Sequence, residues 1–251
     1  MTLKVSIITA SYNSANCIRE CILSVLEQTY ADIEHIFVDA SSTDGTLDVI
    51  YSLVPGANLI SEPDFGIYDA FNKGLRRATG DIVFFLNSDD RIIERDLVSS
   101  AVAKIIDANV DMLFSSVNIT TSNRRVTRHY RGVPLTVKNL ELGSMPPHTG
   151  AFIKKTVYDE MGEFKTDFKI SGDFEWFCRV AARGHFCQKV DRNLVSVEMA
   201  GGGASSQDLR ARWIAHHENI IGLGNNGLKK SHLLLLTRYF RKILEYRIGR
   251  S

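Results

Sequence analysis

Residues 82–90 of this chain read IVFFLNSDD, five apolar residues that run directly into a polar, acidic stretch. The apolar run 82–86 predicts a buried strand, because it is too short to show the periodicity of a helix. The strand would end by releasing two adjacent carboxylates, Asp89 and Asp90, onto a loop. Proteins commonly hold Mg²⁺ or Mn²⁺ through one or two carboxylates together with substrate phosphates. A solvated turn that caps the next helix is the alternative interpretation.

Strand and helix signals alternate along the first ninety residues, with short connections between them. Such alternation predicts βαβ units and a mostly parallel sheet, which is an α/β fold. Ligands of such sheets bind outside the carboxyl ends of the strands. Asp39 and the Asp89–Asp90 pair fall at those ends, so we expect them to line one crevice. Strands are expected at 5–10, 36–38, 58–60 and 82–86, and helices at 17–27, 46–53 and 68–78.

The second half of the chain is less regular. A loop is expected at 143–148, and the glycine- and serine-rich segment 201–206 is predicted to be flexible, so that it could close over a bound diphosphate. Further strands are expected at 112–117, 126–130, 151–153 and 194–197, and helices at 174–182, 207–221 and 231–248.

The composition is that of a globular protein, with 44% hydrophobic and 24% charged residues in a chain of 251. This length predicts one domain with room for an appendage. A net charge of +1 argues against nucleic acid as a partner, because nucleic-acid-binding domains are strongly basic. The sequence shows neither a basic-then-apolar leader nor an apolar run of about 20 residues. The four cysteines form no CxxC pair, so we expect buried free thiols and a cytoplasmic location.

Five segments, taken in order, strongly resemble the family-2 glycosyltransferases of the GT-A fold: VSIITASYN, VDASSTDGT, SEPDFGIYDAFNKGLRRATGD, FLNSDD and SGDFEWFCR. The likeness covers residues 3 to about 206 and is greatest to non-processive bacterial enzymes of capsule, colanic-acid and O-antigen assembly. It implies a GT-A domain over 1–206 with a mixed central sheet. Its Rossmann-like nucleotide-sugar-binding half would be 1–90 and its acceptor half 91–206, followed by a C-terminal helical tail over 207–251.

The resemblance implies a donor site at the ends of the first strands. Thr9, Ser11, Tyr12 and Asp39 would hold the nucleotide base, Asp39 by accepting an N–H of the base and Tyr12 by stacking on it. The alternative for Asp39 is that it merely starts a turn. Ala40 replaces a second acidic residue often found in this motif, which leaves the identity of the base open. A UDP-sugar is the preferred donor.

A turn glycine followed by a helix start forms the next motif. The resemblance places Gly66, Asp69, Asn72 and Lys73 near the base, the ribose or the donor sugar, because helix N-terminal amides favour anionic or hydrogen-bonding ligand groups. For Lys73, a solvated helix face is the alternative.

In the acidic motif, the resemblance implies that Asp90 ligates Mg²⁺ or Mn²⁺ directly, while Asp89 belongs to the same metal site and contacts the ribose or sugar. The cation would bridge the two phosphates and stabilise charge on the departing nucleoside diphosphate. Asn87 and Ser88 are expected to help position the donor.

Asp173 falls where the family keeps its catalytic base, a carboxylate that removes the proton of the acceptor hydroxyl as its oxygen attacks the anomeric carbon. The alternative is that Asp173 only caps the following helix. Glu175 is a competing base candidate. His148 and Glu175 are also candidates for a contact to acceptor or phosphate, and a structural histidine is an equal alternative for His148.

The tail carries apolar residues at helical spacing from Leu233 to Ile248, opposite basic side chains. Such a helix suits an anionic membrane surface. Packing on the catalytic domain, or on a second subunit in a homodimer, is the alternative.

These residues together predict metal-dependent, inverting transfer of one hexosyl or N-acetylhexosaminyl unit from a nucleotide-sugar. By resemblance, the acceptor would be a glycan or a polyprenyl-diphosphate-linked glycan of surface-polysaccharide assembly, at the inner face of the cell membrane. Two alternatives remain. A sugar nucleotidyltransferase would carry a glycine-rich, basic phosphate loop, which residues 11–14 do not offer, and a non-catalytic nucleotide-sugar-binding module would not need Asp90 or Asp173.

Overall fold

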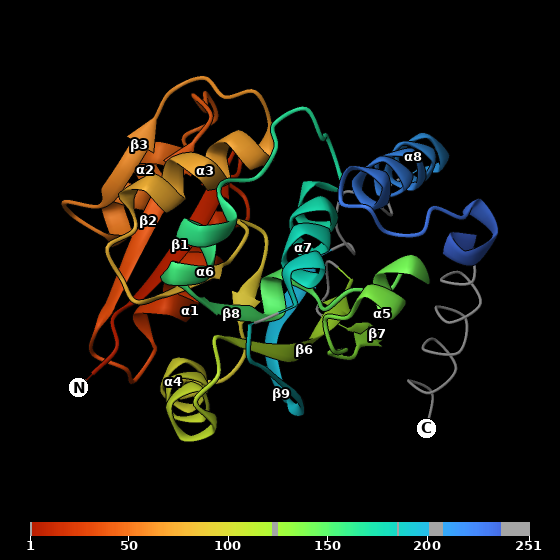
Figure 1. Cartoon of the computed structure of the whole chain (residues 1–251). Coiled ribbons are helices and arrows are strands. Elements are labelled where there is room, and N and C mark those ends of the chain that lie inside the picture. Colours follow the sequence, from red (N-terminus) through yellow and green to blue (C-terminus); the bar gives the residue numbers. More distant parts are fainter. Residues whose placement is uncertain (1, 122–124, 185, 201–207, 237–251) are drawn as a thin grey trace.

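The computed structural model describes residues 2–121, 125–184, 186–200 and 208–236. Nine strands form its central sheet: β1 (Val5–Ser11), β2 (Ile33–Asp39), β3 (Asn58–Ser61), β4 (Ile82–Phe85), β5 (Arg91–Ile92), β6 (Met112–Thr120), β7 (Val126–Tyr130), β8 (Ala151–Lys154) and β9 (Gln188–Ala200). Their order is β3-β2-β1-β4-β8-β6-β9-β5, with β7 paired to β6 (Figure 1). The first four strands in this order are parallel, as predicted for the first ninety residues.

Beyond β4 the strand directions change. β8 pairs antiparallel with both β4 and β6, whereas β9 runs parallel to β6. The short strand β5 pairs antiparallel with the far edge of β9. The sheet is therefore mixed, and residues from both halves of the chain meet in its middle at β4 and β8.

Helices cover both faces of the sheet (Figure 1): α1 (Ile18–Leu26), α2 (Thr46–Leu53), α3 (Ile67–Arg77), α4 (Leu97–Ala108), α5 (Val137–Glu141), α6 (Lys155–Met161), α7 (Gly172–Arg183) and α8 (Leu209–Asn225). Alternate residues of β4 show the two layers. Phe84 stacks on Phe152 in a cluster with α1 and α4, and Phe85 packs against Phe71 in a cluster with α3, α6 and α7. The sheet thus has an apolar core on each face, as expected for strands that are hydrophobic throughout.

Helix α3 lies directly against β1. A Cβ atom on Gly74 would fall 2.4 Å from the Cγ2 atom of Ile8, so this approach requires glycine. The contact fixes the helix, and with it Ile67 and Tyr68 at its first turn.

Several elements differ from the prediction. The prediction leaves α4, α5, α6 and β5 unassigned, and β9 is longer than the expected 194–197. Helix α7 begins at Gly172 rather than at 174, because the amide of Glu175 already donates to the carbonyl of Ser171 at 3.0 Å. Asp173 therefore lies inside the first turn and is not the residue that caps it.

The predicted loop 201–206 and residues 237–248 of the predicted tail helix lie outside the described residues. Within the described part of the chain, no helix combines the length and the apolar character needed to cross a membrane. Cys21 and Cys178 are buried free thiols, as predicted. Cys17 is only partly buried and Cys187 is exposed, so the expectation of burial is wrong for Cys187 and only partly met for Cys17.

Candidate active site

A cleft of about 710 Å³ opens where β1 and β4 end. Ser11 and Tyr12 line it at the end of β1, and Asn87, Ser88 and Asp89 line it in the loop after β4. Tyr12 has 66% of its surface exposed, so its ring is open to stacking by a planar ligand. The structure thus brings these five predicted donor-site residues to one cleft.

The turn before α3 supplies a further wall of the cleft. The Asp64 carboxylate accepts a hydrogen bond from the amide of Gly66 at 2.9 Å, and Gly66 has φ of +114°, which favours glycine. This turn brings Gly66 and Ile67 to the cleft. Asp64 also lines the cleft, and it was not among the predicted site residues.

The side chains of Asp89 and Asp90 differ in their exposure to the cleft. Asp89 is exposed at the cleft, whereas Asp90 is only 2% exposed and accepts a hydrogen bond from the Asn87 amide nitrogen at 3.0 Å. The cleft wall keeps part of the solvent from the Asp89 carboxyl group, which raises its pKa. The structure therefore places Asp89, and not the predicted Asp90, where a cation in the cleft could be reached.

Two oxygen-bearing side chains that line the cleft, Asp89 and Asn87, are of a kind that suits a hard cation. Asp89 offers a carboxylate, and the Oδ1 atom of Asn87 is buried without a hydrogen-bond partner among the described residues. No group of three or more histidine, cysteine or acidic side chains in the described ranges forms a complete metal site. Mg²⁺ or Mn²⁺ bound by one carboxylate, an amide oxygen and substrate phosphates fits such a partial site.

Two predicted base contacts lie behind the cleft instead of in it. Asp39 is fully buried, and its carboxylate accepts hydrogen bonds from the hydroxyls of Ser11 and Ser61 and from the amide and hydroxyl of Ser42. Thr9 is also fully buried, and its hydroxyl bonds to the imidazole of His35. In the structure both residues hold the strand ends together.

Three polar side chains of α3 also bind to other groups of the protein. The Asn72 side chain exchanges two hydrogen bonds with the backbone of Phe164, and Lys73 pairs with Asp69 at 3.2 Å and with Glu62 at 3.0 Å. None of Asp69, Asn72 and Lys73 lines the cleft. The structure does not bring these predicted donor contacts to the site, because helix α3 turns them toward neighbouring loops.

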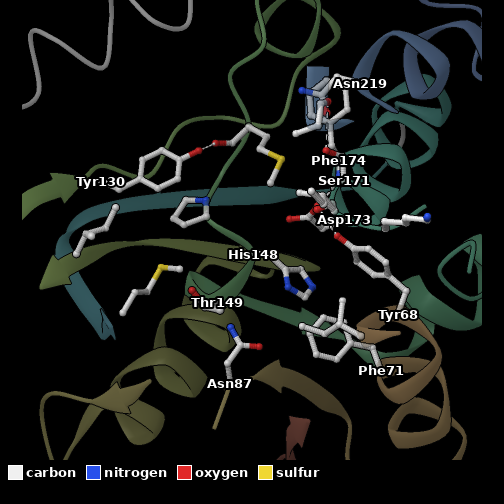
Figure 2. A pocket seen from close by; sticks show the side chains of 18 of the residues that line it. Tyr68, Phe71, Asn87, Tyr130, His148, Thr149, Ser171, Asp173, Phe174 and Asn219 are labelled. Atoms are coloured by element: carbon white, nitrogen blue, oxygen red, sulfur yellow. Dashed lines mark hydrogen bonds between the residues drawn. The ribbon is translucent and has the colours of Figure 1, made fainter. Parts of the chain in front are cut away.

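A second cavity, of about 250 Å³, adjoins the cleft. Figure 2 shows the side chains of Asn87, His148, Tyr68 and Asp173 around it. Ile67 and Asn87 line both cavities, so the two spaces share a wall. The carboxylates of Asp89 and Asp173 therefore open onto adjoining spaces, one on each side of Asn87.

Asp173 is half-buried at the beginning of α7. Its Oδ1 atom accepts hydrogen bonds from the amide of Phe174 at 2.8 Å and from the hydroxyl of Tyr68 at 3.1 Å. Burial outweighs these hydrogen bonds and raises the pKa of Asp173 to about 6. Burial and the nearby Asp173 raise the pKa of Tyr68 as well, so Tyr68 stays protonated and donates.

His148 is enclosed by aromatic rings, among them Phe71 and Phe85. Burial lowers its pKa to about 4, so the ring is neutral at physiological pH. Its Nε2 atom is buried without a partner among the described residues, although the ring lines the second cavity. Glu175, in contrast, is fully buried in ion pairs with Lys165 and Arg179 and lines neither cavity, so the structure excludes it as an acceptor contact.

Several residues of the second cavity were not predicted. Arg128 on β7 is 7% exposed, with its guanidinium group 5.0 Å from the ring centre of Tyr130. Lys169 precedes α7, and Asn219 comes from α8. Tyr68 lies within a motif, two residues after Gly66. Arg128, Lys169 and Asn219 come from segments without a recognisable pattern.

Comparisons with known proteins bear on this geometry. Residues 6–175 match the family described as Glycosyl transferase family 2. An uncharacterized glycosyltransferase of Mycobacterium tuberculosis is 31% identical over 250 residues, which covers 94% of this chain and 91% of the relative. A PGL/p-HBAD biosynthesis glycosyltransferase of Mycobacterium bovis is 29% identical over 179 residues, covering 69% of this chain and 68% of that protein.

Solved structures share the fold. S. aureus TarS 1–349 in complex with UDP-GlcNAc matches with a TM-score of 0.68 at 21% identity, over 93% of this chain and 70% of that one. Mannosyltransferase PcManGT from Pyrobaculum calidifontis, in complex with GDP-Man and Mn²⁺, matches with a TM-score of 0.62 at 22% identity, over 99% and 83%. The mixed sheet with its two helical layers is the GT-A fold of these neighbours. The chain belongs to glycosyl transferase family 2 and is a glycosyltransferase.

Proposed function

We propose that this glycosyltransferase moves one hexosyl or N-acetylhexosaminyl unit from a nucleotide-sugar, bound with Mg²⁺ or Mn²⁺, to a hydroxyl group with inversion at the anomeric carbon. The observation that carries the proposal is the pair of adjoining cavities, with Asp89 in one and Asp173 in the other. Family membership favours transfer over the nucleotidyltransferase and the non-catalytic binding module.

The cleft would bind the donor and the cation, and the second cavity would bind the acceptor. In the cleft, Tyr12 would stack on the base, and Asp89 with Asn87 Oδ1 would hold the cation. A bound cation offsets the charge that develops on the leaving diphosphate. In the second cavity, Asp173 would take the proton of the acceptor hydroxyl. That oxygen forms its bond to the anomeric carbon while the bond from this carbon to the phosphate oxygen breaks. Attack from the opposite face turns an α-linked donor into a β product.

The donor we propose is a UDP-sugar, supported by a structural neighbour that holds UDP-GlcNAc, although another neighbour holds GDP-Man. The acceptor we propose is a glycan or a polyprenyl-diphosphate-linked glycan of surface-polysaccharide assembly. A relative named for PGL/p-HBAD biosynthesis supports a role in biosynthesis.

We further propose that the enzyme works in the cytoplasm at the inner face of the membrane. Leu209, Trp213 and Leu233 on α8 and the segment after it are 81%, 64% and 77% exposed. Arg210 and Lys230 nearby are exposed as well. Apolar side chains beside basic ones support contact with an anionic lipid surface over a homodimer.

The rate of transfer should depend on the ionisation of Asp173. The base must be ionised to accept a proton, and its pKa lies at about 6 rather than near the ordinary value of about 3.9. We therefore expect kcat to rise about tenfold per pH unit below pH 6 and to level off above it. A pH–rate profile of nucleoside diphosphate release checks this; an acid limb centred near pH 4 would contradict it.

Thermal-shift screening tests the proposed donor and cation together. UDP-, GDP- and dTDP-sugars are each added with and without Mn²⁺. A donor at 100 times its Kd stabilises the folded state by about 2.7 kcal/mol, which corresponds to roughly 5–10 °C for a chain of this size. We expect this shift for a UDP-sugar and only with the cation. No shift with any donor, or equal shifts without the cation, would refute the proposed donor or the proposed metal dependence.

A further inference from the structure

Glu218 on α8 binds the backbone that leads into the catalytic aspartate. Its carboxylate accepts hydrogen bonds from three consecutive amides: Lys169 at 2.7 Å, Ile170 at 2.9 Å and Ser171 at 2.8 Å. The residue is only 9% exposed. Successive amides that converge in this way form an anion-binding concavity. In this protein, the anion that fills the concavity is a side chain of the chain itself.

The same segment is held from its other side by Tyr68. The Tyr68 hydroxyl lies 2.7 Å from the carbonyl oxygen of Ile170 and 3.1 Å from Oδ1 of Asp173. A Cβ atom on Gly172 would fall 2.8 Å from the Tyr68 ring, so the backbone lies against this ring. Glu218 thus fixes the amides of the segment, and Tyr68 fixes a carbonyl group of it.

These contacts set the orientation of Asp173, two residues after Ser171. Both hydrogen bonds of the Asp173 carboxylate within the described part of the chain go to Oδ1. Oδ2 therefore stays available to a hydroxyl group in the cavity that Asp173 lines. A shift of the segment 169–171 would turn Oδ2 away from that hydroxyl.

We infer that Glu218 is a positioning residue for sugar transfer, which holds the segment 169–171 so that Asp173 meets the acceptor hydroxyl. This inference rests on the proposed role of Asp173 as the base. Glu218 lies outside the residues 6–175 that match the family, on a helix that the sequence places in the tail. The tail therefore supplies part of the catalytic apparatus, through a side chain that never touches the substrate.

Glu218→Gln is the test variant. Glutamine has the same shape as glutamate but carries no charge. Its NH₂ group would face backbone N–H groups of the segment 169–171, which need an acceptor. We therefore expect the segment to be held less firmly. Misplacement of a catalytic group by about 1 Å costs on the order of 100-fold. We expect kcat for release of nucleoside diphosphate to fall roughly 10- to 100-fold, with the KM for the donor within about twofold of wild type.

The pH profile separates positioning from a general loss of structure. The charge of Glu218 is one of the influences that raise the pKa of Asp173. The acid limb of Glu218→Gln should therefore move to lower pH. The other titratable groups that line the cavity are unchanged in this variant: Tyr68, Arg128, Tyr130, His148 and Lys169.

Asp208→Asn provides a matched control on the same helix. Asp208 caps α8 by accepting the amide of Ala211 at 2.6 Å, whereas the carboxylate that binds the segment 169–171 belongs to Glu218. Asparagine can still cap the helix, so this variant should lower the thermal midpoint only slightly, through the lost charge at the helix N-terminus, and keep the wild-type kcat and pH profile. The assay uses UDP-GlcNAc, UDP-glucose and GDP-mannose with Mn²⁺, water serving as acceptor, and includes Asp173→Asn.

The outcomes distinguish the inference from the proposed function. An active Asp173→Asn would overturn the base assignment itself. An inactive Asp173→Asn beside a Glu218→Gln with wild-type kcat and an unmoved acid limb would overturn the inference alone. Amide hydrogen exchange of the wild type gives an answer that needs neither ligand nor variant: the amides of Lys169, Ile170 and Ser171 should be strongly protected. Exchange as fast as that of open loops would also overturn it.

Discussion

Asp173→Asn is expected to slow sugar transfer by about 10³-fold at pH 8, because a positioned general base typically contributes 10²- to 10⁴-fold. Asparagine has the same shape and can still accept the Tyr68 hydroxyl and the Phe174 amide, but it cannot take a proton from the acceptor. Donor affinity should not change, since the donor site that we propose is the adjoining cleft. Release of nucleoside diphosphate measures the rate, and titration calorimetry of UDP with Mn²⁺ measures the affinity.

The stability of this variant provides the control. The folded pKa of Asp173, about 6, lies above its unfolded value of about 3.9. The group therefore stabilises the fold fully below pH 3.9, and this contribution is lost as pH rises through 6. At pH 8 the wild type keeps a charge in a partly buried place, and asparagine does not. We expect the thermal midpoint of the variant to equal or exceed that of the wild type; an inactive protein with a lowered midpoint would leave unfolding as the cause and contradict this account.

Asp89→Asn is expected to lower kcat/KM by about 10²- to 10³-fold, that is, about 3–4 kcal/mol of transition-state stabilisation. Asp89 is the carboxylate that lines the cleft, so its loss would remove the charged ligand that we propose for the cation. The half-saturating Mn²⁺ concentration for nucleoside diphosphate release should rise at least tenfold, and calorimetry should show weaker Mn²⁺-dependent binding of UDP.

Asp90→Asn tests which of the two aspartates is the metal ligand. The family resemblance makes Asp90 the metal ligand, whereas the structure buries it against the Asn87 side chain. We expect Asp90→Asn to change the Mn²⁺ requirement less than threefold and to lower the rate moderately, through a misplaced Asn87. A greater Mn²⁺ requirement for the Asp90 variant than for the Asp89 variant would show that the assignment from the structure is wrong.

The fold could be predicted well where local patterns are strong. The strand before Asn87 and the alternation of strands and helices over the first ninety residues give the parallel half of the sheet, since buried strands and short connections leave clear apolar runs. The second half was less predictable. Strand β9 pairs with β5 and β6 over long sequence separations, and such pairings leave no local signal.

The residues of the candidate site could likewise be predicted only in part. Tyr12, Gly66, Asn87, Asp89 and Asp173 lie in motifs and at cavity walls. For Asp39, Asn72 and Asp90, a motif places the residue near the site but does not say which way its side chain turns. In the structure, their side chains turn inward to hydrogen-bond with a serine hydroxyl (Asp39), a backbone carbonyl (Asn72) and a side-chain amide (Asp90).

Glu218 and Arg128 illustrate the opposite case. Nothing in the residues beside them signals chemistry, because their roles arise only when α8 and β7 fold against distant segments.

The wall that Ile67 and Asn87 form between the two cavities has an evolutionary consequence. If the two cavities hold donor and acceptor as we propose, a mutation at either residue would alter both preferences at once, so a gain on one side is easily cancelled on the other. Under the proposed function, new specificities are reached more freely by substitutions at exposed or half-buried positions, at Tyr12 and Asp64 for the sugar nucleotide and at Lys169 for the alcohol. Diversification within this scaffold should therefore proceed from the periphery inward.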